Sequence, residues 1–158
     1  MNDPVRILVV EDESAIQQFV EEALTDGGFE AEITQSGEEA LSRFRDGRSG
    51  YRALLTDIGI GAGPNGWVLA RRIREIDPDL PVVYMTGGHA EEWKSQGVPN
   101  SIPHRKAVRT GTTGHRDLAA SEHGLVAGLN GRWHPRQRPS EQRDDGDDGK
   151  ARHGHAPA

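Results

Sequence analysis

Residues 5–12 of the chain are Val-Arg-Ile-Leu-Val-Val-Glu-Asp, a nearly continuous apolar run that ends in two acids. The apolar part has the length and the β-branched character of a strand, and its lack of alternation indicates a strand buried on both faces of a parallel sheet. A helix is predicted from Ser14, with Gln17 as its capping-box partner, to Gly27-Gly28. This stretch therefore predicts a strand followed at once by a helix, with an acidic pair at the turn.

The same unit recurs through the first hundred residues. Further strands are predicted at 29–35, 51–56, 81–86 and from Ser101. Further helices are predicted at 36–46, 66–76 and 89–96, the first of them opened by a second capping box, Ser36 with Glu39. Strands that alternate with helices over short links indicate an α/β, doubly wound fold, in which helices cover both faces of a parallel sheet.

Composition limits the class of protein. A chain of 158 residues with 34% hydrophobic content suffices for one domain with a modest core. Cysteine is absent, which excludes disulfides, thiolate chemistry and cysteine-based zinc sites. No apolar run approaches the roughly 20 residues that span a bilayer, and the start of the chain lacks the pattern of a secretory signal. We expect a soluble cytoplasmic protein that does not enter a membrane.

Charge is unevenly distributed between the two parts of the chain. Residues 1–106 carry 18 acids against 11 lysines and arginines, a net charge of −7, whereas residues 107–158 carry 7 acids against 8 bases, a net charge of +1. Binding to nucleic-acid phosphates needs clustered cations, so the acidic body argues against it. A faint helix-turn-helix pattern at 118–131 is too short for a recognition helix, and no DNA binding is expected.

The functional site of a doubly wound sheet lies beyond the carboxyl ends of its strands. Polar or charged residues occupy four of those ends: Glu11 and Asp12, Asp57, Thr86, and Lys106. Carboxylates that meet at one edge repel each other unless a cation lies among them, and their oxygens suit Mg²⁺. A carboxylate can also act as a nucleophile and form an aspartyl phosphate, which a lysine would stabilise. Asp57, at the end of the expected central strand, is the best nucleophile candidate.

Each of these residues also has an ordinary structural explanation. An acidic pair before a helix can be a solvated turn that favours the helix dipole, and a β-branched residue such as Thr86 is common at a strand end. The agreement of four strand ends makes the functional interpretation of Glu11, Asp12 and Asp57 the stronger one.

The sequence resembles the receiver domain of two-component response regulators. The matching stretches are ILVVEDE at 7–13, LLTDI at 54–58, NGW at 65–67, DLPVVYMTG at 79–87, and Lys106. They span nearly all of residues 5–106 in the right order and spacing. The resemblance implies a flavodoxin-like fold with five parallel strands in the order 2-1-3-4-5, and a receiver domain at 1–106.

The resemblance also implies the chemistry of a phosphorelay. Asp57 would accept a phosphoryl group from a phosphohistidine on a histidine kinase or histidine phosphotransfer protein. Glu11, Asp12, Asp57 and the backbone carbonyl of Gly59 would hold Mg²⁺. Thr86 would turn its hydroxyl toward the phosphoryl group, and Lys106 would contact it. Such a chain is a phosphoacceptor and switch, not an enzyme beyond its own phosphorylation and dephosphorylation, and we expect a monomer or weak dimer with a downstream partner that the sequence does not name.

Two other functions compete with this hypothesis. Residues 61–66 form Gly-x-Gly-x-x-Gly between a strand and a helix, the pattern of a dinucleotide-binding turn. Against it, residues 57–60 separate the strand from the first glycine, and the next strand ends in Thr86, not in the acid that would hold a ribose. The other alternative is a receiver-like scaffold that no longer switches because its C-terminal element is corrupted.

Residues 107–158 depart from the family. Eight glycines, five histidines and only six large apolar residues predict a disordered tail. Receiver domains continue after the lysine with proline, an aromatic residue and a fifth helix, whereas this chain has Lys106-Ala107-Val108. A one-base shift near Pro103 would give Pro-Ile-Ala-Lys-Pro-Phe and then an amphipathic helix. We therefore hypothesise a frameshift, a missing fifth helix and marginal stability.

Overall fold

The computed structural model describes residues 4–46 and 50–106, and beyond them Leu125 and Leu129. The strands of the first two ranges are β1 (Val5–Val10), β2 (Phe29–Thr34), β3 (Ala53–Asp57), β4 (Val82–Thr86) and β5 (Ser101–Arg105). Their helices are α1 (Ser14–Asp26), α2 (Gly37–Arg45), α3 (Gly66–Ile76) and α4 (Trp93–Gln96). None of the helices in this described part has the length and apolarity needed to cross a membrane.

The five strands form one parallel sheet in the order β2-β1-β3-β4-β5. This confirms the predicted doubly wound α/β fold and its flavodoxin-like strand order. β3 is the central strand, and each of its five residues is buried, as is each residue of β4. Because β3 ends at Asp57, the predicted nucleophile lies at the centre of the carboxyl edge of the sheet.

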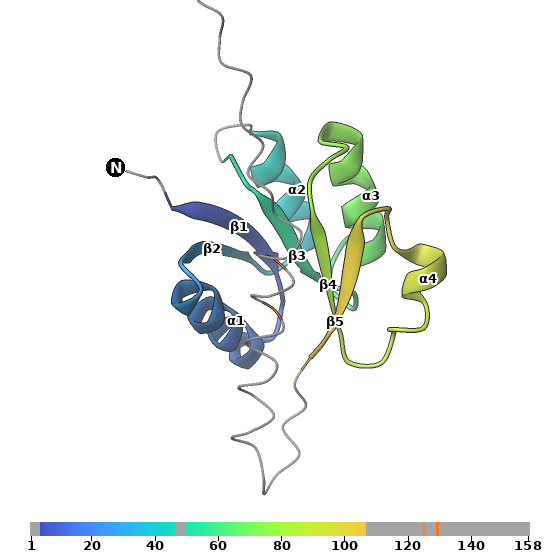
Figure 1. Cartoon of the computed structure of the whole chain (residues 1–158). Coiled ribbons are helices and arrows are strands. Elements are labelled where there is room, and N and C mark those ends of the chain that lie inside the picture. Colours follow the sequence, from blue (N-terminus) through green and yellow to red (C-terminus); the bar gives the residue numbers. More distant parts are fainter. Residues whose placement is uncertain (1–3, 47–49, 107–124, 126–128, 130–158) are drawn as a thin grey trace, which may run out of the picture.

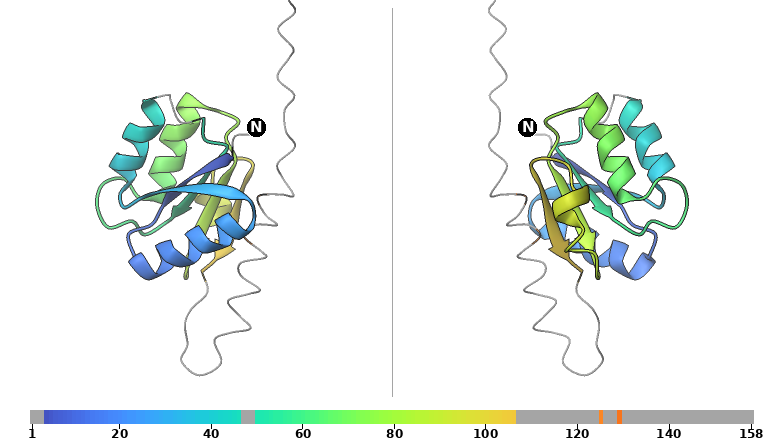
Figure 2. Two further views of the ribbon diagram at one scale, coloured as in Figure 1. Left: turned by 90° about the vertical axis from the view of Figure 1, so that its left-hand side faces the viewer. Right: turned by 90° about the vertical axis from the view of Figure 1, so that its right-hand side faces the viewer.

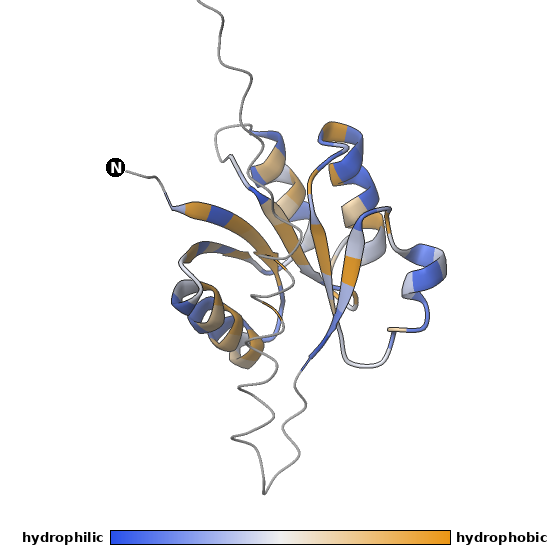
Figure 3. Cartoon of the chain, in the orientation of Figure 1, coloured by the Kyte–Doolittle hydropathy of each residue, from blue (hydrophilic) through white to orange (hydrophobic). Residues whose placement is uncertain are grey.

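Helices cover both faces of the sheet. α2 and α3 lie side by side on one face and α1 lies on the other, while α4 is near the outer edge beside β5 (Figures 1 and 2). Apolar residues concentrate on the strands and on the helix surfaces that meet them (Figure 3). One core cluster joins strands to α2 and α3 and includes Leu54, Leu69 and Tyr84. A second joins the opposite face to α1 and includes Leu24 and Leu55.

Local capping differs between two of the helices. At α2 the prediction is confirmed, because the Ser36 side chain accepts a hydrogen bond from the Glu39 N–H at 3.2 Å. At α1 it is wrong: Glu13 is the capping residue and makes no side-chain cap bond. The Gln17 side chain donates instead to the carbonyl oxygen of Glu11 at 2.6 Å. The Gln17 side chain, which a capping box would use, thus binds the backbone of the acidic turn instead.

α4 is much shorter than the predicted helix, which began at His89. It has four residues from Trp93 to Gln96, and residues 87–92 form bends and turns. The N–H of His89 donates to the Thr86 hydroxyl, which holds the predicted helix start in the turn after β4. The indole of Trp93 packs against the first core cluster and donates to the Ser101 hydroxyl at 3.0 Å, which fixes the short helix to β5.

Leu125 and Leu129 are both helical and buried, at 2% and 6% exposure, and both belong to the second core cluster. Leucines four positions apart share one helix face, and the apolar sheet face offers these two a place to be buried. The predictions of a disordered tail and of a missing fifth helix stay predictions. The other residues of the predicted tail, 107–124, 126–128 and 130–158, lie outside the described residues.

Candidate metal and phosphoacceptor site

The site is built on the carboxyl ends of two neighbouring strands. Val10 of β1 pairs with Thr56 of β3, so the residues that follow them, Glu11 and Asp57, lie next to each other. Asp12 is the next residue along the chain. One carboxylate oxygen from each of these three acids lies within 4.8 Å of the others. The structure therefore brings together the three acids that the sequence singled out.

Lys106 follows β5 and reaches back across the edge of the sheet to this cluster. Its Nζ lies 2.8 Å from Oε2 of Glu11 and 2.9 Å from Oδ2 of Asp57. Its backbone N–H donates to the carbonyl oxygen of Thr86 at 2.9 Å, so β4 fixes the point from which the side chain starts. The lysine side chain is 17% exposed, which makes this a largely buried bridge between two acids.

Burial and charge act in opposite directions on this cluster. Glu11 is fully buried, and this burial raises the pKa of its carboxyl group, although Lys106 and the N–H of Glu13 partly offset the effect. Burial lowers the pKa of the Lys106 ammonium, but its hydrogen bonds to Glu11 and Asp57 outweigh burial, so the net pKa is raised. The lysine therefore stays charged and partly offsets the effect of burial on the Glu11 carboxylate.

Backbone N–H groups hold each carboxylate in place. The N–H of Glu13 donates to Oε1 of Glu11 at 3.0 Å, and that of Gly61 donates to Oδ2 of Asp12 at 3.1 Å. The N–H of Gly59 donates to Oδ1 of Asp57 at 3.3 Å. Gly59 thus contacts the nucleophile candidate through its backbone N–H. The ligand role of its carbonyl oxygen stays a prediction.

Gly66 has a role at the site that the sequence did not reveal. A Cβ atom on this residue would lie 2.2 Å from the carbonyl oxygen of Asp57, so the backbone of α3 approaches the nucleophile residue closely. The N–H of Gly66 donates to the carbonyl oxygen of Ile58 at 3.1 Å. Asn65 caps the helix through a bond from the N–H of Val68. The Asn65-Gly66 pair before an apolar helix could have pointed to this helix start, but only the contact with Asp57 shows why a glycine is needed there.

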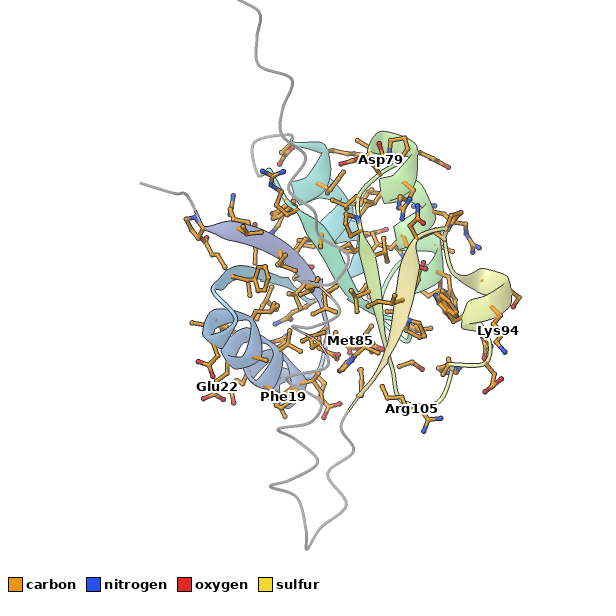
Figure 4. The ribbon with its side chains drawn as sticks, viewed as in Figure 1. Phe19, Glu22, Asp79, Met85, Lys94 and Arg105 are labelled. Atoms are coloured by element: carbon orange, nitrogen blue, oxygen red, sulfur yellow. The ribbon has the colours of Figure 1, made fainter. Side chains whose placement is uncertain are left out.

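Thr86 is fully buried at the end of β4, one register position from the acids. Its hydroxyl oxygen accepts a hydrogen bond from the N–H of His89 at 2.6 Å, which closes the first turn of the loop after β4. Met85, the residue before Thr86, pairs with Asp57 in the sheet. Figure 4 shows Met85 and Arg105 at the same end of the sheet. The Thr86 hydroxyl is therefore near the site, but it is hydrogen-bonded to the backbone of the loop after β4.

The side chains of the cluster fit a small, hard divalent cation. Three carboxylates supply oxygen ligands, and only one of the three, Asp12, is exposed enough for water to complete a coordination shell. Among the described residues, Lys106 is the lysine that balances one of the three negative charges. The remaining charge and the oxygen ligands match what Mg²⁺ requires, and Glu11, Asp12 and Asp57 would hold it.

Comparison with known sequences gives the same result as the geometry. Residues 7–99 match the family described as "Response regulator receiver domain". The response regulator receiver protein CpdR of Brucella abortus is 37% identical over 82 residues, which cover 52% of this chain and 66% of CpdR. The transcriptional regulatory protein TrcR of Mycobacterium tuberculosis is 34% identical over 83 residues, which cover 52% of this chain and 31% of TrcR. The chain thus spans less than two thirds of these curated relatives.

Solved structures show the same fold. A response regulator receiver protein from Sinorhizobium medicae superposes with a TM-score of 0.70 at 33% identity, over 82% of this chain and 94% of the other. The chemotaxis protein CheY4 of Vibrio cholerae gives a TM-score of 0.62 at 21% identity, over 78% and 99% of the two chains, a likeness of fold alone. Since the family match covers more than half of its length and the acidic cluster lies where that fold places its site, the chain belongs to the response regulator receiver domains of two-component signalling.

Proposed function

We propose that the chain is a stand-alone receiver domain of a cytoplasmic phosphorelay, in which Asp57 accepts a phosphoryl group from a phosphohistidine. The donor would be a histidine kinase or a histidine phosphotransfer protein. The observation that carries the proposal is the position of the Asp57 carboxylate, within 4.8 Å of oxygens from Glu11 and Asp12 and 2.9 Å from the ammonium of Lys106. The chain would act as a phosphoacceptor, and its chemistry would be limited to its own phosphorylation and dephosphorylation.

The chemistry needs a nucleophile and neutralisation of charge. An Asp57 oxygen attacks phosphorus, an oxygen–phosphorus bond forms, and the nitrogen–phosphorus bond to the donor imidazole breaks as that nitrogen takes up a proton. Mg²⁺, held by Glu11, Asp12 and Asp57, would neutralise the phosphoryl oxygens during transfer. Lys106 would supply a second positive contact, because its Nζ already lies at hydrogen-bond distance from Asp57.

Phosphorylation would then act on the loop after β4. The Thr86 hydroxyl accepts the His89 N–H in this structure, so it must give up this bond before it can turn toward a phosphoryl oxygen. Release of this hydrogen bond would allow residues 87–92, the loop that connects β4 to α4, to change conformation. One added dianion would thus bias a two-state element whose surface a downstream partner reads.

The proposal is tested by incubation with a small-molecule phosphodonor and Mg²⁺, followed by intact-protein mass spectrometry. The expected result is the mass of one added phosphoryl group, lost when Mg²⁺ is chelated and lost in Asp57→Ala. Asp26→Ala is the matched control, because this aspartate is exposed at the C-terminal end of α1, whereas the acidic pair precedes the N-terminal end of that helix, and it should leave labelling unchanged. A wild-type chain that takes up no phosphoryl group would support the inert scaffold instead.

A further inference from the structure

The loop between β3 and α3, residues 58–65, touches the first residue of α2. A Cβ atom on Gly37 would lie 2.5 Å from the carbonyl oxygen of Pro64 and 2.9 Å from its Cγ, so the two backbones are in close contact. Gly37 is buried under this contact. Within the same loop, Ile58 and Ile60 are buried in the first core cluster. The path of the loop is therefore determined by the core below it and by α2 beside it.

A second contact between the loop and α2 supports the first. Gly63 has a φ of +84°, a conformation that side chains rarely adopt, and a Cβ atom there would lie 3.0 Å from Cγ of Glu38. Glu38 is the second residue of α2. The loop thus packs against the first turn of α2 at two positions, and glycines make both close approaches possible.

The same loop also holds one of the three acids of the site. The N–H of Gly61 donates to Oδ2 of Asp12 at 3.1 Å, and a Cβ atom on Gly61 would lie 3.1 Å from that oxygen. Glu11 and Asp57 each bind the ammonium of Lys106 in addition to a backbone N–H. Within residues 4–46 and 50–106, the group that holds the exposed carboxylate of Asp12 is the Gly61 N–H. The orientation of Asp12 therefore depends on where the loop lies.

We propose that Gly37 is a positioning residue for the metal site. It lets Pro64 approach α2, which places the loop so that the Gly61 N–H holds Asp12 ready to bind Mg²⁺. A carboxylate that is oriented before the ion arrives loses less freedom on binding, and groups that orient metal ligands are typically worth about ten- to a hundredfold in affinity. The inference rests on the proposed Mg²⁺ site and extends it to α2, which supplies none of the three acids.

The test measures the Mg²⁺ dissociation constant of the full chain by isothermal titration calorimetry. Gly37→Ala should raise this constant about tenfold, because the added methyl group displaces Pro64 and with it the Gly61 N–H. Gly97→Ala is the matched control. A Cβ atom there would lie 2.6 Å from Cδ1 and 2.8 Å from the carbonyl oxygen of Trp93, so the overpacking is similar, but Gly97 follows α4 and does not touch the loop. This control should leave the constant unchanged.

Asp12→Asn separates failure of this inference from failure of the proposed function. Unchanged Mg²⁺ affinity in Asp12→Asn would show that Asp12 does not hold the metal, which would overturn the proposed site and the inference with it. Weakened affinity in Asp12→Asn, together with equal constants for Gly37→Ala and Gly97→Ala, would overturn the positioning role alone.

A second measurement follows the hydrogen bond itself and needs no metal. The amide proton of Gly61 is bonded to a carboxylate, so its NMR resonance should lie downfield in the wild-type chain. It should move upfield in Gly37→Ala and stay in place in Gly97→Ala. If Gly37→Ala does not fold, Pro64→Ala replaces it, because it removes the ring beside Gly37 and adds no atom. Pro64→Ala should raise the Mg²⁺ constant about threefold, and an unchanged constant with an unchanged Gly61 resonance would overturn the proposal.

Discussion

At the scale of single residues, Lys106 is the residue on which the buried acids depend. Among the residues that the structure describes, its ammonium pairs with both Glu11, which is fully buried, and Asp57, which is 8% exposed. A buried carboxylate that loses its partner strongly destabilises the fold, because neither water nor a cation then compensates its charge. The same lysine therefore supports the fold and prepares the phosphoacceptor.

We predict that Lys106→Met lowers the free energy of unfolding by about 3 kcal/mol in the presence of a chelator. Added Mg²⁺ should recover part of the loss, because a divalent cation neutralises the same acids. Urea unfolding with and without Mg²⁺ measures both effects. Lys94→Met is the control, since this lysine is exposed on α4 (Figure 4) and should change stability by no more than about 0.5 kcal/mol. Equal stability of Lys106→Met and wild type would contradict the prediction.

His104 is a second residue with an energetic consequence. It pairs with Met85 in the sheet and lies two residues beyond Ile102, so its side chain faces the same second core cluster. Burial lowers the pKa of its imidazole below the ordinary value of 6.5. The unfolded chain therefore takes up a proton at this residue before the folded chain does, and stability is lost as the pH falls below about 6.5.

We predict that His104→Leu reduces this loss of stability on acidification. The measurement is urea unfolding of both chains at pH values of about 7.5 and 5.5, which lie on either side of the ordinary histidine pKa. The raised pKa of Glu11 contributes equally to both chains and cancels in the difference. A His104→Leu chain that loses as much stability as wild type would refute the assignment.

At the scale of elements, the start of α3 determines how closely the backbone can approach Asp57. A Cβ on Gly66 would meet the carbonyl oxygen of Asp57 at 2.2 Å and the Cα of Ile58 at 3.0 Å, and neither backbone atom can move alone. Gly66, the last glycine of residues 61–66, thus allows the start of α3 to pack closely against the backbone after β3. This is a local reason for the pattern that resembled a dinucleotide-binding turn.

We predict that Gly66→Ala destabilises the domain by about 2 kcal/mol, because the added methyl group overpacks a backbone contact. It should also slow phosphorylation, since the displaced backbone carries Asp57. Chemical unfolding and the rate of mass gain with a phosphodonor measure the two effects. Gly88→Ala is the control, because a Cβ there has no neighbour within 4 Å. Equal effects of the two substitutions would exclude the steric explanation.

At the scale of the whole molecule, the two faces of the sheet are covered unequally. α2 and α3 close one face with a large cluster, whereas α1 shares the other with Leu125 and Leu129. Burial of apolar area gives about 25 cal/mol per Å², so the apolar area that residues after β5 bury beside α1 contributes to the stability of the molecule. The stability of the molecule should therefore respond to the sequence that follows β5.

We predict that replacing the chain from Pro103 onward with the sequence of the alternative reading frame raises the thermal midpoint by at least about 5 °C. That sequence begins Pro-Ile-Ala-Lys-Pro-Phe, keeps the lysine at its place, and continues as an amphipathic helix. Differential scanning calorimetry of the two chains measures the shift. Equal midpoints would show that the present C-terminal segment closes the face equally well.

Much of the fold and of the candidate site could be predicted from sequence, for an identifiable reason. Buried parallel strands have continuous apolar runs, and their carboxyl ends meet at one edge, so the ends of the predicted strands pointed to Glu11, Asp12 and Asp57, which the structure brings together. The prediction failed where tertiary contacts overrule local patterns. Gln17 bonds the Glu11 carbonyl in place of a cap, and Trp93 anchors a helix shorter than the predicted one.

The sequence by itself determined the alternation of strands and helices, the parallel sheet and the acids at its edge, because hydrophobic periodicity and chain connectivity are local properties. Only the tertiary structure decided that Lys106 bridges two of those acids, that Gly66 touches the backbone of Asp57, and that Leu125 and Leu129 are buried. Each of these contacts joins residues far apart or fits atoms within a few ångströms, and no pattern of neighbouring residues encodes such a distance.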